Sequence, residues 1–235
     1  MPQRARPLAA VLWDLDGTLV DTEGYWMERE FELVAEYGTG AWTQAHAHAL
    51  VGRDLRDAAR YIGLHGGVTL PIDHIVHLLL DGVIERVQRR VPWRPGAREL
   101  LADLRDAGIA CALVTMSWRR LTDALLPALP ADSFVTVVTG DDVAQGKPHP
   151  EAYLTAAARL GVSPQHCLAI EDSPTGARSA QAAGCVTLTV PHLVPIPAGI
   201  GHLQLPSLAG LGAVHLLQMH RDYCVERLGP SAADP

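Results

Sequence analysis

Residues 8–23 read LAAVLWDLDGTLVDTE, an apolar run that ends abruptly on carboxylates. The run closes at Trp13, and Asp14 and Asp16 follow two positions apart, with Gly17 directly behind them. An Asp-Gly pair after a strand is common turn chemistry, so this stretch alone favours a simple turn. Whether the two carboxylates have another purpose depends on what the rest of the chain brings to the same place.

The composition of the chain limits its class. The 235 residues are 48% hydrophobic and 19% charged, which is typical of a soluble globular protein. The formal net charge of -7 argues against a general nucleic-acid binder, which usually carries a basic face. No run approaches the roughly 20 apolar residues of a membrane span, and the first apolar run is a poor signal peptide. The four cysteines contain no CxxC pair. Their positions in apolar runs favour buried free thiols, so we expect a cytoplasmic protein. The charge and the lack of a long apolar run lead us to expect no nucleic-acid or membrane partner.

Four further apolar runs resemble the first. The five expected strands cover residues 9–14, 110–115, 134–139, 167–171 and 186–190. They are continuous rather than alternating, as parallel strands covered on both faces are. Helical patterns follow at residues 98–107, 119–129, 150–160, 176–183 and 213–228. This alternation predicts an α/β fold with a doubly wound, Rossmann-like parallel sheet.

A long insert interrupts the alternation. The first two runs are about 95 residues apart, far more than a crossover helix needs. Helix-like patterns fill the insert at residues 25–37, 43–50, 55–62 and 72–90. We therefore expect a helical cap domain at 22–91, inserted into an α/β core made of 1–21 and 92–235. Such an insert can act as a lid over a site, and the alternative is helices that pack passively against the sheet.

Polar side chains follow the expected strands at one edge of the sheet, where open α/β sheets bind ligands. They are Asp14 and Asp16, the stretch VTMS at 114–117, Lys147, and the stretch IEDSPTG at 170–176. Buried carboxylates that lie close together repel unless they are paired or bind a metal. Oxygen ligands without histidine or cysteine suit Mg²⁺ beside phosphate. A lysine and hydroxyl groups would then neutralise and bind a phosphoryl group, and the backbone N–H groups of Gly17 and Thr18 can bind the same anion.

These stretches, in this order, resemble the four motifs of the haloacid dehalogenase superfamily. The resemblance covers roughly residues 8–208, and the helical insert is similar to that of the small-cap members. It is greatest to the branch that holds β-phosphoglucomutases and small phosphatases. The resemblance implies that Asp14 is a nucleophile that forms an aspartyl-phosphate. It implies that Asp16 protonates the leaving oxygen and then activates the acceptor.

The same resemblance assigns the remaining motif residues. It implies that Lys147 bridges Asp14 and the phosphoryl group. The implied phosphate ligands are Thr115, the backbone of Met116, and Ser117. The implied Mg²⁺ ligands are Asp14, the backbone carbonyl of Asp16, Asp172, and Glu171 directly or through water. Two of these residues have ordinary alternatives, since Lys147 can be a solvated loop lysine and Thr115 can cap the next helix.

Further candidates stay open. Arg53, in the loop VGRDLRDA, either contacts the substrate or lies on the surface. Arg119 either contacts an anionic substrate or starts a helix. Asp141 and Asp142 are expected to cap a helix or face solvent, and the alternative is that an acid here assists the metal site indirectly. The cap also contains metal-like histidine pairs, for which packing or solvation is favoured because a zinc site needs more ligands; they are His46, His48, His74 and His77.

The sequence therefore predicts a Mg²⁺-dependent phosphatase that hydrolyses a small phosphomonoester, such as a sugar phosphate, as a monomer or homodimer. A sugar phosphomutase of the β-phosphoglucomutase type would use the same core residues. Trp118 and Arg119 stand where small polar residues are more typical of the mutases, which favours the phosphatase. A non-catalytic protein that binds a phosphorylated ligand is a second alternative, against which the paired aspartates argue.

Overall fold

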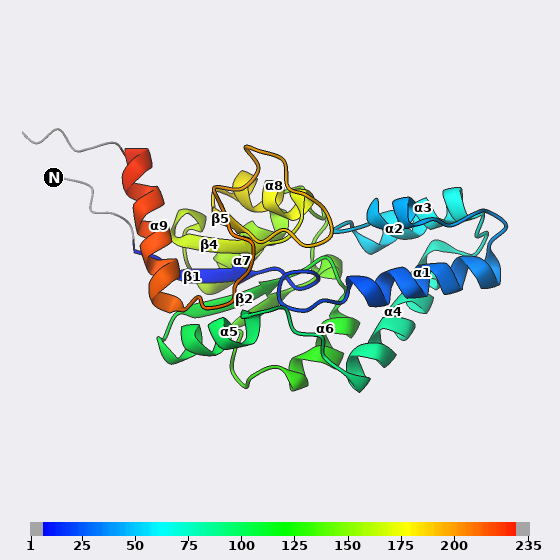
Figure 1. Ribbon diagram of the computed structural model, residues 1–235, viewed down its shortest axis with the longest axis horizontal. Coiled ribbons are helices and arrows are strands. Elements are labelled where there is room, and N and C mark those ends of the chain that lie inside the picture. Colours follow the sequence, from blue (N-terminus) through cyan, green and yellow to red (C-terminus); the bar gives the residue numbers. More distant parts are fainter. Residues whose placement is uncertain (1–6, 229–235) are drawn as a thin grey trace, which may run out of the picture.

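A six-stranded parallel sheet forms the centre of the computed structural model, which describes residues 7–228 (Figure 1). The strand order is β3-β2-β1-β4-β5-β6, and every pairing is parallel. The strands are β1 (Ala10–Trp13), β2 (Ala110–Val114), β3 (Thr136–Val138), β4 (Cys167–Glu171), β5 (Val186–Thr189) and β6 (Leu203–Gln204). The predicted fold class is confirmed. The edge strand β6 was not predicted, because its two residues are too few to show a pattern.

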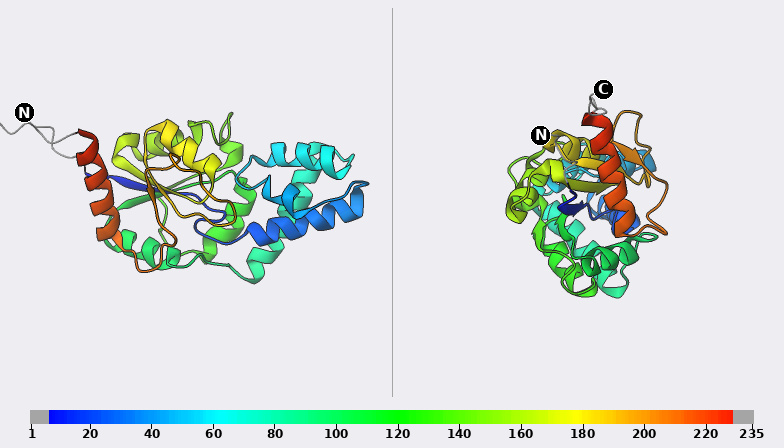
Figure 2. Two further views of the ribbon diagram at one scale, coloured as in Figure 1. Left: turned by 45° about the horizontal axis from the view of Figure 1, so that its top comes forward. Right: turned by 90° about the vertical axis from the view of Figure 1, so that its left-hand side faces the viewer.

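Helices cover both faces of the sheet (Figures 1 and 2). They are α5 (Ala97–Asp106), α6 (Arg119–Leu125), α7 (Glu151–Leu160) and α8 (Pro174–Ala183). Helix α9 (Ala213–Leu228) lies across the end of the sheet that is opposite the cap (Figure 1). Side chains of a strand alternate between the two faces. Val11 and Trp13 of β1 pack in one cluster with the leucines of α5 and α6, and α9 contacts α5. Ala10 and Leu12 pack in a second, alanine-rich cluster with α7 and α8. The core is therefore two apolar layers, one on each side of the sheet.

Four helices form a separate group beyond the carboxyl ends of the strands (Figure 1). They are α1 (Glu23–Tyr37), α2 (Gln44–His48), α3 (Leu55–Gly66) and α4 (Ile72–Arg89). Two linkers connect them to the sheet, and these linkers run side by side: Val20 and Trp93 form an antiparallel bridge, and the N–H of Asp21 donates to the carbonyl of Pro92 at 2.6 Å. We call α1 to α4 the cap helices. The domain boundaries at 21/22 and 91/92 remain a prediction of the sequence.

Local chemistry explains where two helices differ from their predicted ranges. Helix α6 ends at Leu125 rather than at residue 129, and the chain continues as a short 3-10 helix, Leu126–Ala128. This turn contains Pro127, which has no N–H for an α-helical bond. Helix α8 begins at Pro174 rather than at residue 176, because the hydroxyl of Ser173 caps it by accepting from the N–H of Gly176 at 3.1 Å. Within residues 7–228, no helix is both long and apolar enough to cross a membrane.

Candidate active site

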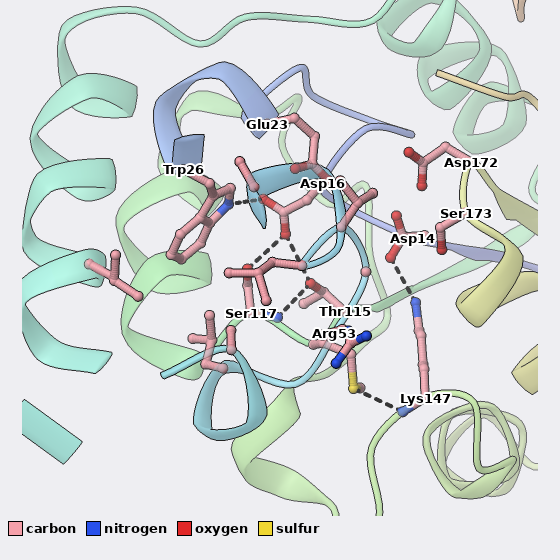
Figure 3. A pocket seen from close by; sticks show the side chains of 18 of the residues that line it. Asp14, Asp16, Glu23, Trp26, Arg53, Thr115, Ser117, Lys147, Asp172 and Ser173 are labelled. Atoms are coloured by element: carbon pink, nitrogen blue, oxygen red, sulfur yellow. Dashed lines mark hydrogen bonds and ion pairs between the residues drawn. The ribbon is translucent and has the colours of Figure 1, made fainter. Parts of the chain in front are cut away.

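A pocket lies between the carboxyl edge of the sheet and the cap helices (Figure 3). It brings together most of the residues that the sequence singled out, from four strand ends and one loop of the cap. These lining residues are Asp14, Asp16, Arg53, Thr115, Met116, Ser117, Lys147 and Asp172. Glu171 lies directly behind them in β4 and is fully buried. The pocket therefore combines the carboxylates, the lysine and the hydroxyl groups that phosphoryl chemistry requires.

Lys147 is at the centre of this arrangement. Its Nζ donates to Asp14 Oδ1 at 2.7 Å, to Glu171 Oε1 at 2.6 Å and to the carbonyl of Val114 at 2.9 Å. The side chain is only 2% exposed, which excludes a solvated loop lysine. Burial alone would lower the pKa of Lys147, but the neighbouring carboxylates outweigh it and raise the pKa. A permanent positive charge thus touches the oxygen of the expected nucleophile.

Three carboxylates form a cluster that fits a divalent cation. One oxygen from each of Asp14, Glu171 and Asp172 lies within 4.8 Å of the others, and all three side chains are buried. Asp172 Oδ2 is buried and has no hydrogen-bond partner among the described residues. Burial, followed by the charge of Asp14, raises the pKa of Asp172 well above its ordinary value. An unpaired oxygen in an oxygen-only cluster is what a hard cation such as Mg²⁺ binds, and its charge would relieve the repulsion.

Glu171 is held by more partners than the sequence indicated. Besides Lys147, it accepts from the hydroxyl of Tyr153 at 2.6 Å and from that of Ser173 at 3.4 Å. Tyr153 belongs to α7 and is fully buried. Its helix pattern marks it only as part of a buried face, so the sequence carried no signal for this bond. Glu171 thus fixes Lys147 from behind, while Asp172 keeps an unpaired oxygen at the acid cluster.

A glycine is needed at position 17 because Asp172 of the acid cluster lies very close to it, not because its N–H binds a phosphate. Its φ of +83° lies in the left-handed region, and a Cβ placed there would stand 2.1 Å from Asp172 Oδ2. The N–H of Gly17 donates to the carbonyl of Val20 at 2.7 Å, and that of Thr18 points to the carbonyl of Leu15 at 3.4 Å. Neither residue lines the pocket. The structure therefore does not place these two N–H groups where the sequence analysis expected them to bind phosphate.

Asp16 connects the core to the first cap helix. Its carboxylate accepts from Thr22 Oγ1 at 2.5 Å and from the indole N–H of Trp26 at 3.0 Å. On the core side it accepts from Ser117 Oγ at 2.7 Å and from Thr115 Oγ1 at 3.3 Å (Figure 3). Thr22 directly precedes α1 and Trp26 lies in its first turns. The sequence did not single out these two residues, because a helix pattern does not show which side chain will contact an acid that lies in another part of the fold.

The hydroxyl residues after β2 serve the site rather than the next helix. Thr115 Oγ1 accepts from the N–H of Ser117 at 2.9 Å, whereas the residue that precedes α6 is Trp118. Thr115 therefore does not cap α6. The hydroxyl groups of Thr115 and Ser117 both donate to Asp16, and both residues line the pocket.

The remaining candidates from the sequence do not belong to the pocket or to a metal site. Arg119 starts α6, and its guanidinium donates to Asp142 Oδ2 at 2.7 Å. Asp142 also caps the short 3-10 helix Gly140–Asp142, while Asp141 accepts from the N–H of Arg119 at 2.9 Å. These three residues do not line the pocket. Among residues 7–228, none of the cap histidines belongs to a group of three or more potential metal ligands.

The cap side of the pocket carries acids that the sequence analysis did not identify. Glu23 and Glu30 of α1 are only 6% and 5% exposed, and both line the pocket. Burial, followed by the charges of Asp16 and Asp14, raises the pKa of Glu23 well above its ordinary value. The periodicity of residues 25–37 predicts a helix with one buried face, but it does not reveal that acidic side chains lie on that face.

The α/β fold and the relatives of this chain define the class of protein as a hydrolase of phosphoric monoesters. The chain belongs to the haloacid dehalogenase-like hydrolases, because the family model with that description matches residues 11–190. Protein CbbY of Rhodobacter capsulatus is 32% identical over 205 residues, which cover 78% of this chain and 86% of that protein. Hexitol phosphatase A of Escherichia coli (strain K12) is 35% identical over 194 residues, which cover 76% and 81%. The crystal structure of CbbY from Rhodobacter sphaeroides in complex with phosphate superposes with a TM-score of 0.81 at 29% identity and covers 89% of this chain and 99% of that one.

Proposed function

We propose that this protein is a Mg²⁺-dependent phosphatase that hydrolyses a small phosphomonoester, a sugar phosphate or similar metabolite, through an aspartyl-phosphate on Asp14. The observation that carries the proposal is the buried contact between Lys147 Nζ and Asp14 Oδ1 beside the acid cluster. A carboxylate nucleophile splits hydrolysis into two easier steps. The similarity to a hexitol phosphatase and to a protein solved with bound phosphate supports a phosphorylated metabolite as the substrate.

In the first step, an oxygen of Asp14 attacks phosphorus. The bond from phosphorus to the leaving oxygen breaks, and Asp16 gives a proton to that oxygen. Lys147 stays charged and stabilises the negative charge that spreads over the phosphoryl oxygens. The hydroxyl groups of Thr115 and Ser117 orient those oxygens. A bound Mg²⁺ would supply further positive charge to the phosphoryl group. The residues that would hold the Mg²⁺ are Asp14, Asp172, the backbone carbonyl of Asp16, and Glu171 directly or through water.

In the second step, water attacks the phosphorus of the aspartyl-phosphate and transfers a proton to Asp16. The bond between phosphorus and Asp14 breaks, so inorganic phosphate leaves and both aspartates return to their starting states. Asp16 lies at the hinge between core and cap, where it can act on groups that enter between them. Catalysis by a well-placed acid and base contributes roughly 10² to 10⁴ in rate.

The phosphatase proposal is tested with purified protein on a panel of phosphomonoesters. We expect release of inorganic phosphate in Mg²⁺, a loss of roughly 10²-fold or more in EDTA, and recovery when Mg²⁺ is restored. A sugar phosphate that isomerises faster than it releases phosphate, in the presence of a bisphosphate primer, would instead identify a phosphomutase. Tight binding without turnover of any phosphoester would identify a binding protein and contradict both enzymes.

Binding of Mg²⁺ should stabilise the fold, and more so at high pH. Burial and the neighbouring Glu171 raise the pKa of Asp14 to about 7. Between the ordinary carboxyl pKa of about 4 and this value, the folded protein holds more protons than the unfolded chain. The metal-free protein should therefore lose stability as the pH rises through that window. Mg²⁺ competes with these protons, so its stabilising effect should be larger at pH 8 than at pH 5.

The measurement is thermal unfolding with and without Mg²⁺ at both pH values. A Mg²⁺ concentration of about one hundred times Kd stabilises by about 2.7 kcal/mol, which raises Tm by roughly 5 to 10 °C in a chain of this size. Asp172→Asn should remove most of this rise, whereas the same change at the exposed Asp123 should keep it. An equal rise in both variants would show that the metal binds elsewhere.

A further inference from the structure

Helix α1 presents a line of three pocket-lining residues that runs away from the nucleophile. Glu23, Trp26 and Glu30 are three and four positions apart, so they share one face of the helix. Glu23 lies close enough to Asp14 for that charge to affect its pKa. Glu30 is seven residues further on, about 10 Å along the helix axis, and α1 extends away from the sheet toward the outer end of the cap (Figure 1). Glu30 therefore lies in the part of the pocket that the leaving group of a substrate would occupy.

Glu30 is a buried acid with an unpaired carboxylate oxygen. It is 5% exposed, and its Oε2 has no hydrogen-bond partner among the described residues. Leu50 and Leu79, which line the same pocket, are apolar. The indole of Trp42 offsets part of the effect of burial, although Trp42 Nε1 also lacks a hydrogen-bond partner in the described part of the chain. A buried polar oxygen without a partner destabilises a fold, so the fold itself does not explain this side chain.

The state of Glu30 suits a neutral polar ligand. Burial raises the pKa of Glu30 to about 8, so at neutral pH most molecules carry the protonated carboxyl group. Such a group offers a hydroxyl donor and a carbonyl acceptor, which together match a hydroxyl group of a ligand. Within residues 7–228, the only cationic side chains that line the pocket are Lys147 and Arg53. Lys147 is bound to Asp14, and Arg53 is exposed, with its guanidinium 5.6 Å from the ring centre of Tyr61.

We propose that Glu30 is a specificity-determining residue that hydrogen-bonds a hydroxyl group of the substrate at the end away from the phosphoryl group. The inference rests on the proposed phosphatase function and narrows its substrate class to monophosphates of sugars or polyols. A second phosphate or a carboxylate at that end would lose hydration beside a carboxyl group, with only the exposed Arg53 as a further cation among the lining residues of 7–228, so it would bind more weakly than a hydroxyl group. Glu30 thus selects by both attraction and exclusion.

The test compares Glu30→Leu and Glu30→Gln with wild type and with Glu36→Leu. Glu36 lies on the same helix with its side chain exposed, so it controls for the loss of a glutamate. The substrates are sugar and polyol monophosphates, fructose 1,6-bisphosphate, and p-nitrophenyl phosphate, which has no hydroxyl group for Glu30. The first readout is the ratio of kcat/KM for the best hydroxylated monophosphate to kcat/KM for p-nitrophenyl phosphate. The second readout is Tm.

We expect Glu30→Leu to lower this ratio by roughly tenfold, because the hydroxyl group of the substrate would be left buried without a partner. Glu30→Gln keeps a donor and an acceptor and should retain most of the ratio, and Glu36→Leu should leave it unchanged. The Tm of Glu30→Leu should equal or exceed that of wild type, because an unpaired buried acid is replaced by an apolar side chain. A side chain with only a structural role would leave the ratio unchanged and lower Tm.

Three results would overturn the inference about Glu30. The first is an equal loss for both substrate types in Glu30→Leu together with a lower Tm. The second is a wild-type enzyme that prefers the bisphosphate, or that hydrolyses p-nitrophenyl phosphate but no sugar or polyol monophosphate; in that case the phosphatase proposal stands alone. The third is a wild-type protein that hydrolyses no phosphoester in Mg²⁺, which would remove the phosphatase proposal as well.

Discussion

Asp14→Asn should reduce the release of phosphate by roughly 10³-fold or more, since a change in the nucleophile removes the covalent route. The amide has nearly the same shape as the carboxylate but does not attack phosphorus. It also ends the ion pair with Lys147, whose Nζ now donates to Asp14 Oδ1 at 2.7 Å. The measurement is turnover of the best substrate of the panel in saturating Mg²⁺.

Acid quenching gives a direct measurement of the same prediction. Wild-type protein mixed with radiolabelled substrate and quenched in acid should carry covalent phosphate, and Asp14→Asn should carry none. Asp123→Asn, an identical change at an exposed position of α6, should behave as wild type. Lys147 keeps its bonds to Glu171 and Val114 in the Asp14 variant, so we expect it to fold. Undiminished turnover in a folded Asp14→Asn protein would exclude Asp14 as the nucleophile.

Asp16→Asn should slow both steps of the reaction, and the loss in the first step should depend on the leaving group. With an alkyl phosphomonoester, the loss should be roughly 10² to 10⁴ in kcat, because the leaving oxygen needs a proton. With p-nitrophenyl phosphate the first step should be much less affected, since nitrophenolate leaves without a proton. The second step still needs a base to activate water. Rapid mixing should therefore show a burst of about one equivalent of nitrophenol per active site, followed by slow turnover.

The burst separates a chemical role of Asp16 from a structural one. Asp16 accepts from Thr22 and Trp26 across the hinge, so its replacement also weakens the attachment of α1. A general loss of structure would lower Tm and would reduce both substrates by the same factor, with no burst. Absence of the nitrophenol burst at unchanged Tm would also contradict proton donation to the leaving oxygen. Asp123→Asn again serves as the matched control.

The sequence by itself determined the fold class and the location of the site. Continuous apolar runs separated by helical patterns specify a parallel sheet covered on both faces, and the ends of parallel strands come together at one edge. Asp14, Lys147 and Asp172 follow such strands in the chain, so their meeting in one pocket follows from local patterns and topology. Gly161 and Gly184, which directly follow two of the expected helical patterns, end those helices with positive φ.

The tertiary structure decided which partner each side chain takes. The bond of Tyr153 to Glu171 and the contact of Trp26 with Asp16 join elements that are far apart in the chain or belong to different layers. The unpaired Oε2 of Glu30 is likewise visible only in the folded chain. A helical period reveals that one face is buried, but it does not reveal what that face meets. Likewise, the sequence allowed the N–H of Gly17 to bind an anion, but in the folded chain this N–H donates to the carbonyl of Val20. Local patterns thus determined which functional groups lie at the edge of the sheet. Packing between the core and the cap helices decided which hydrogen bonds hold each group, because a hydrogen bond depends on positions that only the folded chain fixes.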